Sequence, residues 1–96
     1  MFDNDLLNKL KYGVRLINVS RGGLINESVL AKALTSGLVS GAALDVFESE
    51  PLQKNHELRD FQQCIFGSHN ASNTVDAVER TSLLALDILK GYLDAR

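Results

Sequence analysis

The sequence predicts an α/β fold with about three parallel strands and helices packed on the sheet. Three segments rich in apolar and β-branched residues, at positions 14–19, 38–47 and 64–66, read as strands. Helical patterns lie before, between and after them, in the order helix, strand, helix, strand, loop, strand, helix. Strands joined by crossovers of this kind run parallel, with right-handed connections.

In the first half of the chain, residues that commonly begin or end helices and strands mark the bounds of the elements. A short helix is expected over residues 3–12, because Asp3 or Asn4 can cap it and Gly13 can end it. Residues 14–19 (VRLINV) then form a mostly buried strand, which the Gly22-Gly23 pair breaks.

Capping and turn residues also mark the elements expected from Asn26 onward. Asn26 can cap a helix that runs through Ser36, and Gly37 can stop it before the strand at 38–47. Residues 48–60 are polar, contain the only proline, and read as a loop with one helical turn near Leu58. After the strand at 64–66, a long helix is expected from about Asn73 to the C-terminus.

Composition excludes several classes of protein. A 96-residue chain with 45% hydrophobic and 23% charged residues is a globular chain of at most one domain. The net charge of −2 without a clustered basic face argues against nucleic-acid binding. No apolar run approaches the ~20 residues that span a bilayer, so no membrane association is expected. The single Cys64 reads as a small buried hydrophobe and favours a cytoplasmic location. No metal site is predicted.

Polar side chains follow each predicted strand where the strand ends. Arg21 comes after the first strand, Glu48 and Glu50 after the second, and His69 after the third. Ligands bind at this rim in open parallel sheets, so the three side-chain types together favour a catalytic site. Each alone has an ordinary explanation as a surface arginine, a loop carboxylate or a turn histidine. His56 lies in a polar loop and is expected to be solvated and without a role.

Three motifs carry a family resemblance. Asn18–Asn26 (NVSRGGLIN), Asp45–Pro51 (DVFESEP) and Ser68–Ala71 (SHNA) resemble the signatures of the NAD-dependent D-isomer-specific 2-hydroxyacid dehydrogenases, which include D-3-phosphoglycerate dehydrogenase. The match runs from Leu6 onward, and its three motifs appear in the family's order with the expected elements between them.

The resemblance implies an oxidoreductase that transfers hydride between NAD and a D-2-hydroxy acid or 2-keto acid. By motif position, Arg21 looks like the catalytic arginine, Glu50 like the catalytic glutamate and His69 like the acid/base histidine. Asp45 would contact the nicotinamide side of NAD, and Ser20 and the Arg21 backbone would line the same pocket, with His69 beside it. An arginine fork suits a substrate carboxylate, and a histidine suits proton transfer near neutral pH.

Two departures from the family pattern limit what the chain contains. Ser68 stands where the family usually has proline. No G-x-G-x-x-G occurs, so the pyrophosphate loop is missing. Residues 1–96 therefore look like a partial Rossmann fold: the second half of the NAD-binding domain plus the helix leading out of it. The particular hydroxy acid, and NAD against NADP, stay open.

Two readings of the whole chain remain. The first is a fragment of the dehydrogenase. The alternative is a catalytically inactive half-domain or remnant that acts only as a self-associating α/β module. In either case the exposed sheet edges and the apolar surface of the C-terminal helix favour a homo-oligomer, most simply a twofold dimer. If that helix instead folds back on the sheet, the chain is a compact monomer.

Overall fold

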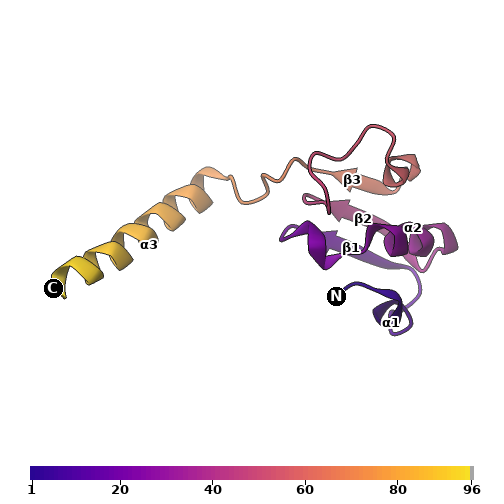
Figure 1. Ribbon diagram of the computed structural model, residues 1–96, viewed down its shortest axis with the longest axis horizontal. Coiled ribbons are helices and arrows are strands. Elements are labelled where there is room, and N and C mark those ends of the chain that lie inside the picture. The colour runs from indigo at the N-terminus through magenta and orange to yellow at the C-terminus, as the bar shows by residue number, and fades with distance from the viewer. Residues whose placement is uncertain (96) are drawn as a thin grey trace.

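The computed structural model describes residues 1–95 and confirms an α/β fold (Figure 1). Its elements are α1 (Asn4–Leu7), β1 (Val14–Asn18), η1 (Gly22–Leu24), α2 (Glu27–Ser36), β2 (Val39–Leu44), η2 (Glu57–Asp60), β3 (Cys64–Phe66) and α3 (Val75–Asp94).

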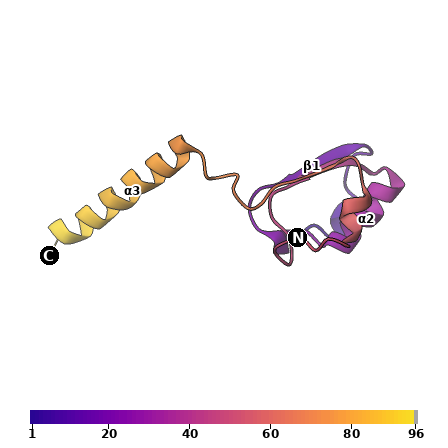
Figure 2. The ribbon, with the colours of Figure 1, turned by 90° about the horizontal axis from the view of Figure 1, so that it is seen from above.

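The three strands form one parallel sheet in the order β1-β2-β3, as predicted. Asn18 pairs with Leu44, and Leu44 pairs with Phe66, so all three strands end at the same rim. One face of the sheet is covered by α2, which lies on a single side of the strands in Figure 2. The core forms there, between α2, β2 and η2; its most deeply buried large side chains are Leu30, Val39, Val46 and Leu58.

The opposite face of the sheet is open to solvent. Ile17 on β1 and Ile65 on β3 are each 72% exposed, although both are strand residues. The prediction that the first strand is mostly buried is therefore wrong for its alternate residues. Successive side chains of a strand point to opposite faces, and among the described residues only one face is covered.

Local capping explains where the helices begin and end. Asn26 Oδ1 accepts a hydrogen bond from Val29 N at 3.1 Å, and Gly37 adopts a left-handed φ of 82°, so α2 has the predicted bounds. The first helix is shorter than predicted. Asp3 caps it, but beyond Leu7 the amides of Lys9 and Leu10 bond to carbonyls three residues back, and the chain tightens into turns.

The second strand also ends earlier than predicted, at Leu44 instead of Phe47. The Phe47 amide bonds to the Glu50 side chain at 3.2 Å, which turns the backbone away from the ladder. The helical turn expected near Leu58 is present as η2, and the third strand has the predicted bounds.

Helix α3 projects away from the body of the protein (Figures 1 and 2). Thr74 caps it, and none of its residues is buried. The molecule is accordingly long, with extents of 58 × 30 × 21 Å. The alternative in which this helix folds back on the sheet is not what the structure shows. Across the described residues, no helix is long and apolar enough to cross a membrane.

Candidate active site

The site is built where the three strands end. Beyond the strands, main-chain hydrogen bonds continue across the rim: Asp45 N donates to Asn18 O at 3.0 Å, and His69 N donates to Asp45 O at 2.8 Å. The segments that follow β1, β2 and β3 are thereby tied to one another. The sheet itself brings the predicted residues to one edge.

His69 and Glu50 form the central pair. His69 Nδ1 lies 2.8 Å from Glu50 Oε2, with the side chains 44% and 37% exposed. The hydrogen bond from His69, together with that from the Phe47 amide, lowers the pKa of the Glu50 carboxyl below its usual 4.5. His69 has a φ of 61°, in the left-handed region that non-glycine residues seldom adopt. Such backbone conformations concentrate at functional sites.

Asp45 lies behind this pair as a buried carboxylate. Its Oδ2 accepts a hydrogen bond from Ala71 N at 2.8 Å, and this bond is the main cause of the lowered pKa of its carboxyl. Gly67 packs directly on the side chain, because a Cβ at that position would overlap Asp45 Oδ1. The Asp45 side chain thus fixes the turn that carries His69.

The turn after β1 is organised by a buried asparagine. Asn18 Oδ1 accepts hydrogen bonds from the Ser20 amide at 3.1 Å and from Ser20 Oγ at 3.0 Å, and Asn18 Nδ2 donates to Arg21 O at 3.0 Å. The Arg21 side chain is exposed and donates to Ser20 O at 2.7 Å. The structure brings Arg21 to the same rim as His69 but gives the two side chains no direct contact.

Gly22 joins this turn to the loop that follows β2. Its backbone lies so close to the Phe47–Glu48 peptide that a Cβ would overlap the Phe47 carbonyl. Only a glycine at position 22 therefore allows the Arg21 segment to pack against the segment that carries Glu50.

A pocket of about 490 Å³ opens beside the His69–Glu50 pair. Its polar lining includes Asp45, and its apolar wall includes Phe47 and Phe66, whose rings lie 5.8 Å apart. The pocket is lined by Asp45, Phe47, Glu50, Pro51, Leu52, Arg59, Phe66, Gly67, Ser68 and His69. Ser20 and Arg21 do not line this pocket.

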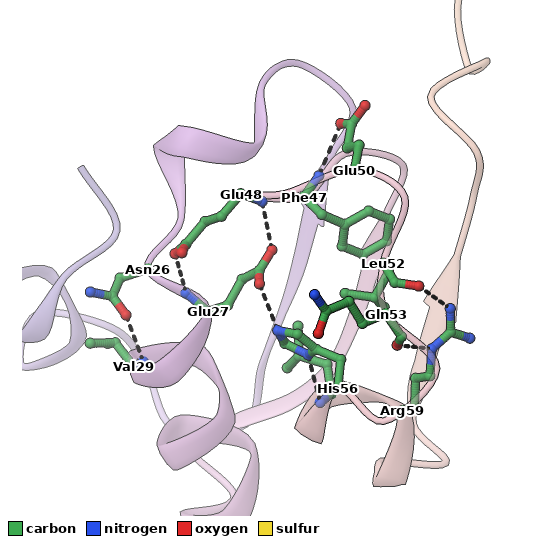
Figure 3. A network of polar contacts seen from close by, with 11 residues as sticks. Asn26, Glu27, Val29, Phe47, Glu48, Glu50, Leu52, Gln53, His56 and Arg59 are labelled. Atoms are coloured by element: carbon green, nitrogen blue, oxygen red, sulfur yellow. Dashed lines mark hydrogen bonds and ion pairs between the residues drawn. The ribbon is translucent and has the colours of Figure 1, made fainter.

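The sequence does not predict the contacts of three residues at or beside this rim. One is Asn18, although asparagine side chains commonly form a hydrogen bond with the backbone two residues further on. His56 was expected to be solvated, and this is wrong: its Nε2 lies 2.8 Å from Glu27 Oε2, as Figure 3 shows. Nothing in the sequence distinguishes Glu27, because a glutamate in the first turn of a helix is ordinary.

Cys64 is half-buried rather than fully buried, and its partial burial raises the pKa of the thiol.

The parallel α/β sheet, with Asp45, Glu50 and His69 gathered where its strands end, is part of a Rossmann-like fold. The model of the D-isomer specific 2-hydroxyacid dehydrogenase NAD binding domain matches residues 1–71. The chain belongs to this family.

Relatives of known activity support the assignment. The glyoxylate reductase of Thermofilum pendens is 41% identical over 97% of this chain, and D-3-phosphoglycerate dehydrogenase 2 of Arabidopsis thaliana is 39% identical over 97%. A D-isomer specific 2-hydroxyacid dehydrogenase from Xanthobacter autotrophicus Py2, solved in complex with NADPH and MES, superposes with a TM-score of 0.65 at 38% identity, covering 68% of this chain and 21% of that one. The family's cofactor is a nicotinamide dinucleotide.

The chain spans only part of these enzymes. It covers 29% of the length of the Thermofilum protein and 15% of the Arabidopsis protein.

Proposed function

We propose that this chain supplies the acid/base half of the active site of an NAD-dependent D-2-hydroxyacid dehydrogenase. Residues 1–96 correspond to the second half of the NAD-binding domain plus the helix leading out of it. The contact of 2.8 Å between His69 Nδ1 and Glu50 Oε2 is the observation that carries the proposal. Catalytic roles fall to Arg21, Glu50 and His69.

In this proposal His69 exchanges the proton of the substrate hydroxyl. When a 2-keto acid is reduced, the developing alkoxide needs a proton, and the ring nitrogen that does not face Glu50 is free to donate it. Glu50 fixes the orientation of the ring through its contact with His69 Nδ1. In the oxidative direction the same nitrogen accepts the proton.

Arg21 has the chemistry to bind the substrate carboxylate. Its guanidinium is exposed at the rim and makes only one hydrogen bond, to Ser20 O, among the described residues. The remaining donors can form a bidentate pair with a carboxylate, which a lysine cannot reproduce. When bound, a nicotinamide cofactor would supply the hydride, and the residues that would hold its nicotinamide end are Asp45, Ser20, the Arg21 backbone and His69.

For the substrate class we propose a small 2-keto acid such as glyoxylate or hydroxypyruvate, which the names of the glyoxylate reductase and hydroxypyruvate reductase relatives suggest. The proposal takes NAD as the cofactor after the family's NAD binding domain, and NADH and NADPH are to be compared in the chimera described below, because one relative is solved in complex with NADPH.

The test is a chimera in which this chain replaces the matching segment of the Thermofilum glyoxylate reductase. We expect NADH oxidation with glyoxylate or hydroxypyruvate, and a loss of roughly 10²-fold or more in kcat on His69→Ala, as removal of a general acid predicts. Arg21→Lys should raise KM as well. Asn70→Ala is the matched control, because its exposed side chain makes no hydrogen bond or ion pair among the described residues. A His69→Ala chimera with normal kcat contradicts the proposal.

The 96-residue chain alone is expected not to oxidise NADH with 2-keto acids, because it carries no G-x-G-x-x-G phosphate loop. Turnover proportional to the concentration of this chain, and absent in Arg21→Ala, would overturn this expectation.

Self-association and compartment complete the proposal. The apolar side chains of α3 are exposed, among them Leu83, Leu84, Leu86, Ile88, Leu89 and Leu93, and so is the open face of the sheet. Such surface favours a homodimer, which light scattering on dilute samples tests: a stable mass of one chain would exclude it. The same surface favours the alternative, an inactive self-associating module, and an inactive chimera would support that alternative.

A cytoplasmic location suits the free Cys64 thiol and is tested by cell fractionation.

A further inference from the structure

Two carboxylates join the start of α2 to the loop that follows β2 (Figure 3). Glu48 Oε1 accepts a hydrogen bond from Glu27 N at 2.8 Å, and Glu27 Oε1 accepts one from Glu48 N at 2.7 Å. Each side chain thus binds the other residue's main chain, across 21 positions of sequence. This reciprocal pair fixes the loop against the helix.

His56 completes the arrangement. Its Nδ1 accepts a hydrogen bond from Leu58 N at 3.2 Å, so the proton of the neutral ring lies on Nε2. Nε2 therefore donates to Glu27 Oε2, 2.8 Å away. The ring bridges η2 and α2 with both nitrogens used.

The chemistry of position 27 requires a carboxylate. The Glu27 side chain is only 10% exposed, and its two oxygens accept from two different donors, Glu48 N and His56 Nε2. A glutamine at this position has only one side-chain oxygen. Its NH₂ group would therefore face either Glu48 N or His56 Nε2, and two donors would oppose each other. A buried donor left without an acceptor is costly.

This arrangement leads directly to the proposed active site. The amides of Phe47 and Glu48 are consecutive: the first donates to Glu50 Oε1 and the second to Glu27 Oε1. Because Glu27 holds the peptide next to the one that Glu50 binds, displacement of Glu27 moves the anchor of Glu50.

We propose that Glu27 and His56 are positioning residues, which hold the turn at residues 47–50 so that Glu50 meets His69. The catalytic meaning of this role rests on the proposed function. The contacts themselves do not, and they can be tested in the full 96-residue chain without any assay of turnover.

The test is an NMR titration of the Glu50 side-chain carboxyl carbon. In the native chain its pKa lies below the ordinary 4.5, chiefly because His69 and the Phe47 amide donate to it, while the nearby Asp45 charge acts in the opposite direction. If Glu27→Gln displaces the turn, these bonds weaken and the Glu50 pKa rises. Removal of a negative charge without movement would instead lower it, so the sign of the shift separates position from charge.

Glu57→Gln is the charge-matched control. Glu57 neighbours His56 in sequence, is exposed, and its side chain makes no hydrogen bond or ion pair among the described residues. This variant removes the same charge without touching the contact, and it should leave the Glu50 titration without a rise.

A pair of His56 variants separates the roles of the two ring nitrogens. His56→Gln keeps a donor at the place of Nε2 and loses the acceptor for Leu58 N, whereas His56→Asn does the reverse. We expect His56→Gln to retain the native Glu50 titration and His56→Asn to raise its pKa. If Glu27→Gln fails to fold, this pair of variants still tests the positioning role.

Unchanged Glu50 titration in both Glu27→Gln and His56→Asn would overturn the proposal, as would equal shifts in the two His56 variants. An inactive chimera with a normal Glu50 titration would instead count against the proposed function and leave the positioning role intact.

Discussion

Replacement of Gly22 by alanine should destabilise the protein strongly, because its backbone lies against the Phe47–Glu48 peptide. A Cβ at position 22 would be 2.7 Å from Glu48 N and closer still to the Phe47 carbonyl, whereas ordinary van der Waals contact begins at 3.4 Å. The obstacle is main chain and not the flexible end of a side chain. The loop must therefore retreat as a unit.

The expected cost follows from that geometry. Overpacking costs typically about 1–3 kcal/mol, and an obstructing peptide places Gly22→Ala at about 3 kcal/mol. With roughly 4–8 °C per kcal/mol for a domain of this size, the melting temperature should fall by about 12–24 °C. The φ of Gly22 is not in the left-handed region, so this loss measures contact and not backbone strain.

Gly23→Ala is the matched control in the adjacent position. A Cβ there meets nothing within 4 Å, so its effect on the free energy of unfolding should stay within about 0.5 kcal/mol. Urea denaturation of the two variants gives both midpoint and slope, and an unchanged slope shows that only stability differs. If Gly22→Ala is as stable as Gly23→Ala, the close packing of the two loops is refuted.

Three further outcomes are expected. Leu58→Ala should lower the free energy of unfolding by about 2–5 kcal/mol, since Leu58 is 0% exposed, while Val75→Ala, at an 82% exposed position, should change it by less than about 0.5 kcal/mol by urea denaturation. Asn18→Leu should cost about 1–3 kcal/mol because it leaves the polar groups of the following turn without partners, and an unchanged midpoint would contradict the role of that side chain. The pKa values of Glu50 and Asp45 are lowered on folding, so their contribution is complete above the unfolded values of 4.5 and 3.8 and is lost as the pH falls through the lower folded values. Stability should therefore decline with acid below about pH 4.5, and Glu50→Gln should flatten that decline in melts recorded across this range.

Local chemistry explains why much of the fold was predictable. Asn26 and Gly37 bound α2 because an asparagine side chain satisfies a free helix amide and a glycine accepts a left-handed φ. The crossover order required parallel strands, and parallel strands end together, which placed Arg21, Glu50 and His69 on one rim. These inferences use neighbours in sequence or a general rule of topology.

The environment of a side chain, in contrast, depends on distant parts of the chain. His56 stands in a polar segment, and its pairing with Glu27 depends on the loop returning to the start of a helix 29 positions earlier. Ile17 is apolar and lies on a strand, yet it is exposed because nothing among the described residues covers its face. Helix α3 has the amphipathic pattern of a packed helix and projects free of the sheet.

The sequence by itself determined the element order, the parallel sheet and the three polar residues at its carboxyl rim, because caps, apolar periodicity and crossover handedness act over short stretches of chain. Only the tertiary structure decided which groups touch: the contact of Glu50 with His69, the packing of Gly22 on Phe47, and the Glu27–His56 pair. Contacts of this kind join residues 19 or more positions apart, and their geometry is set by how the loops close over the core.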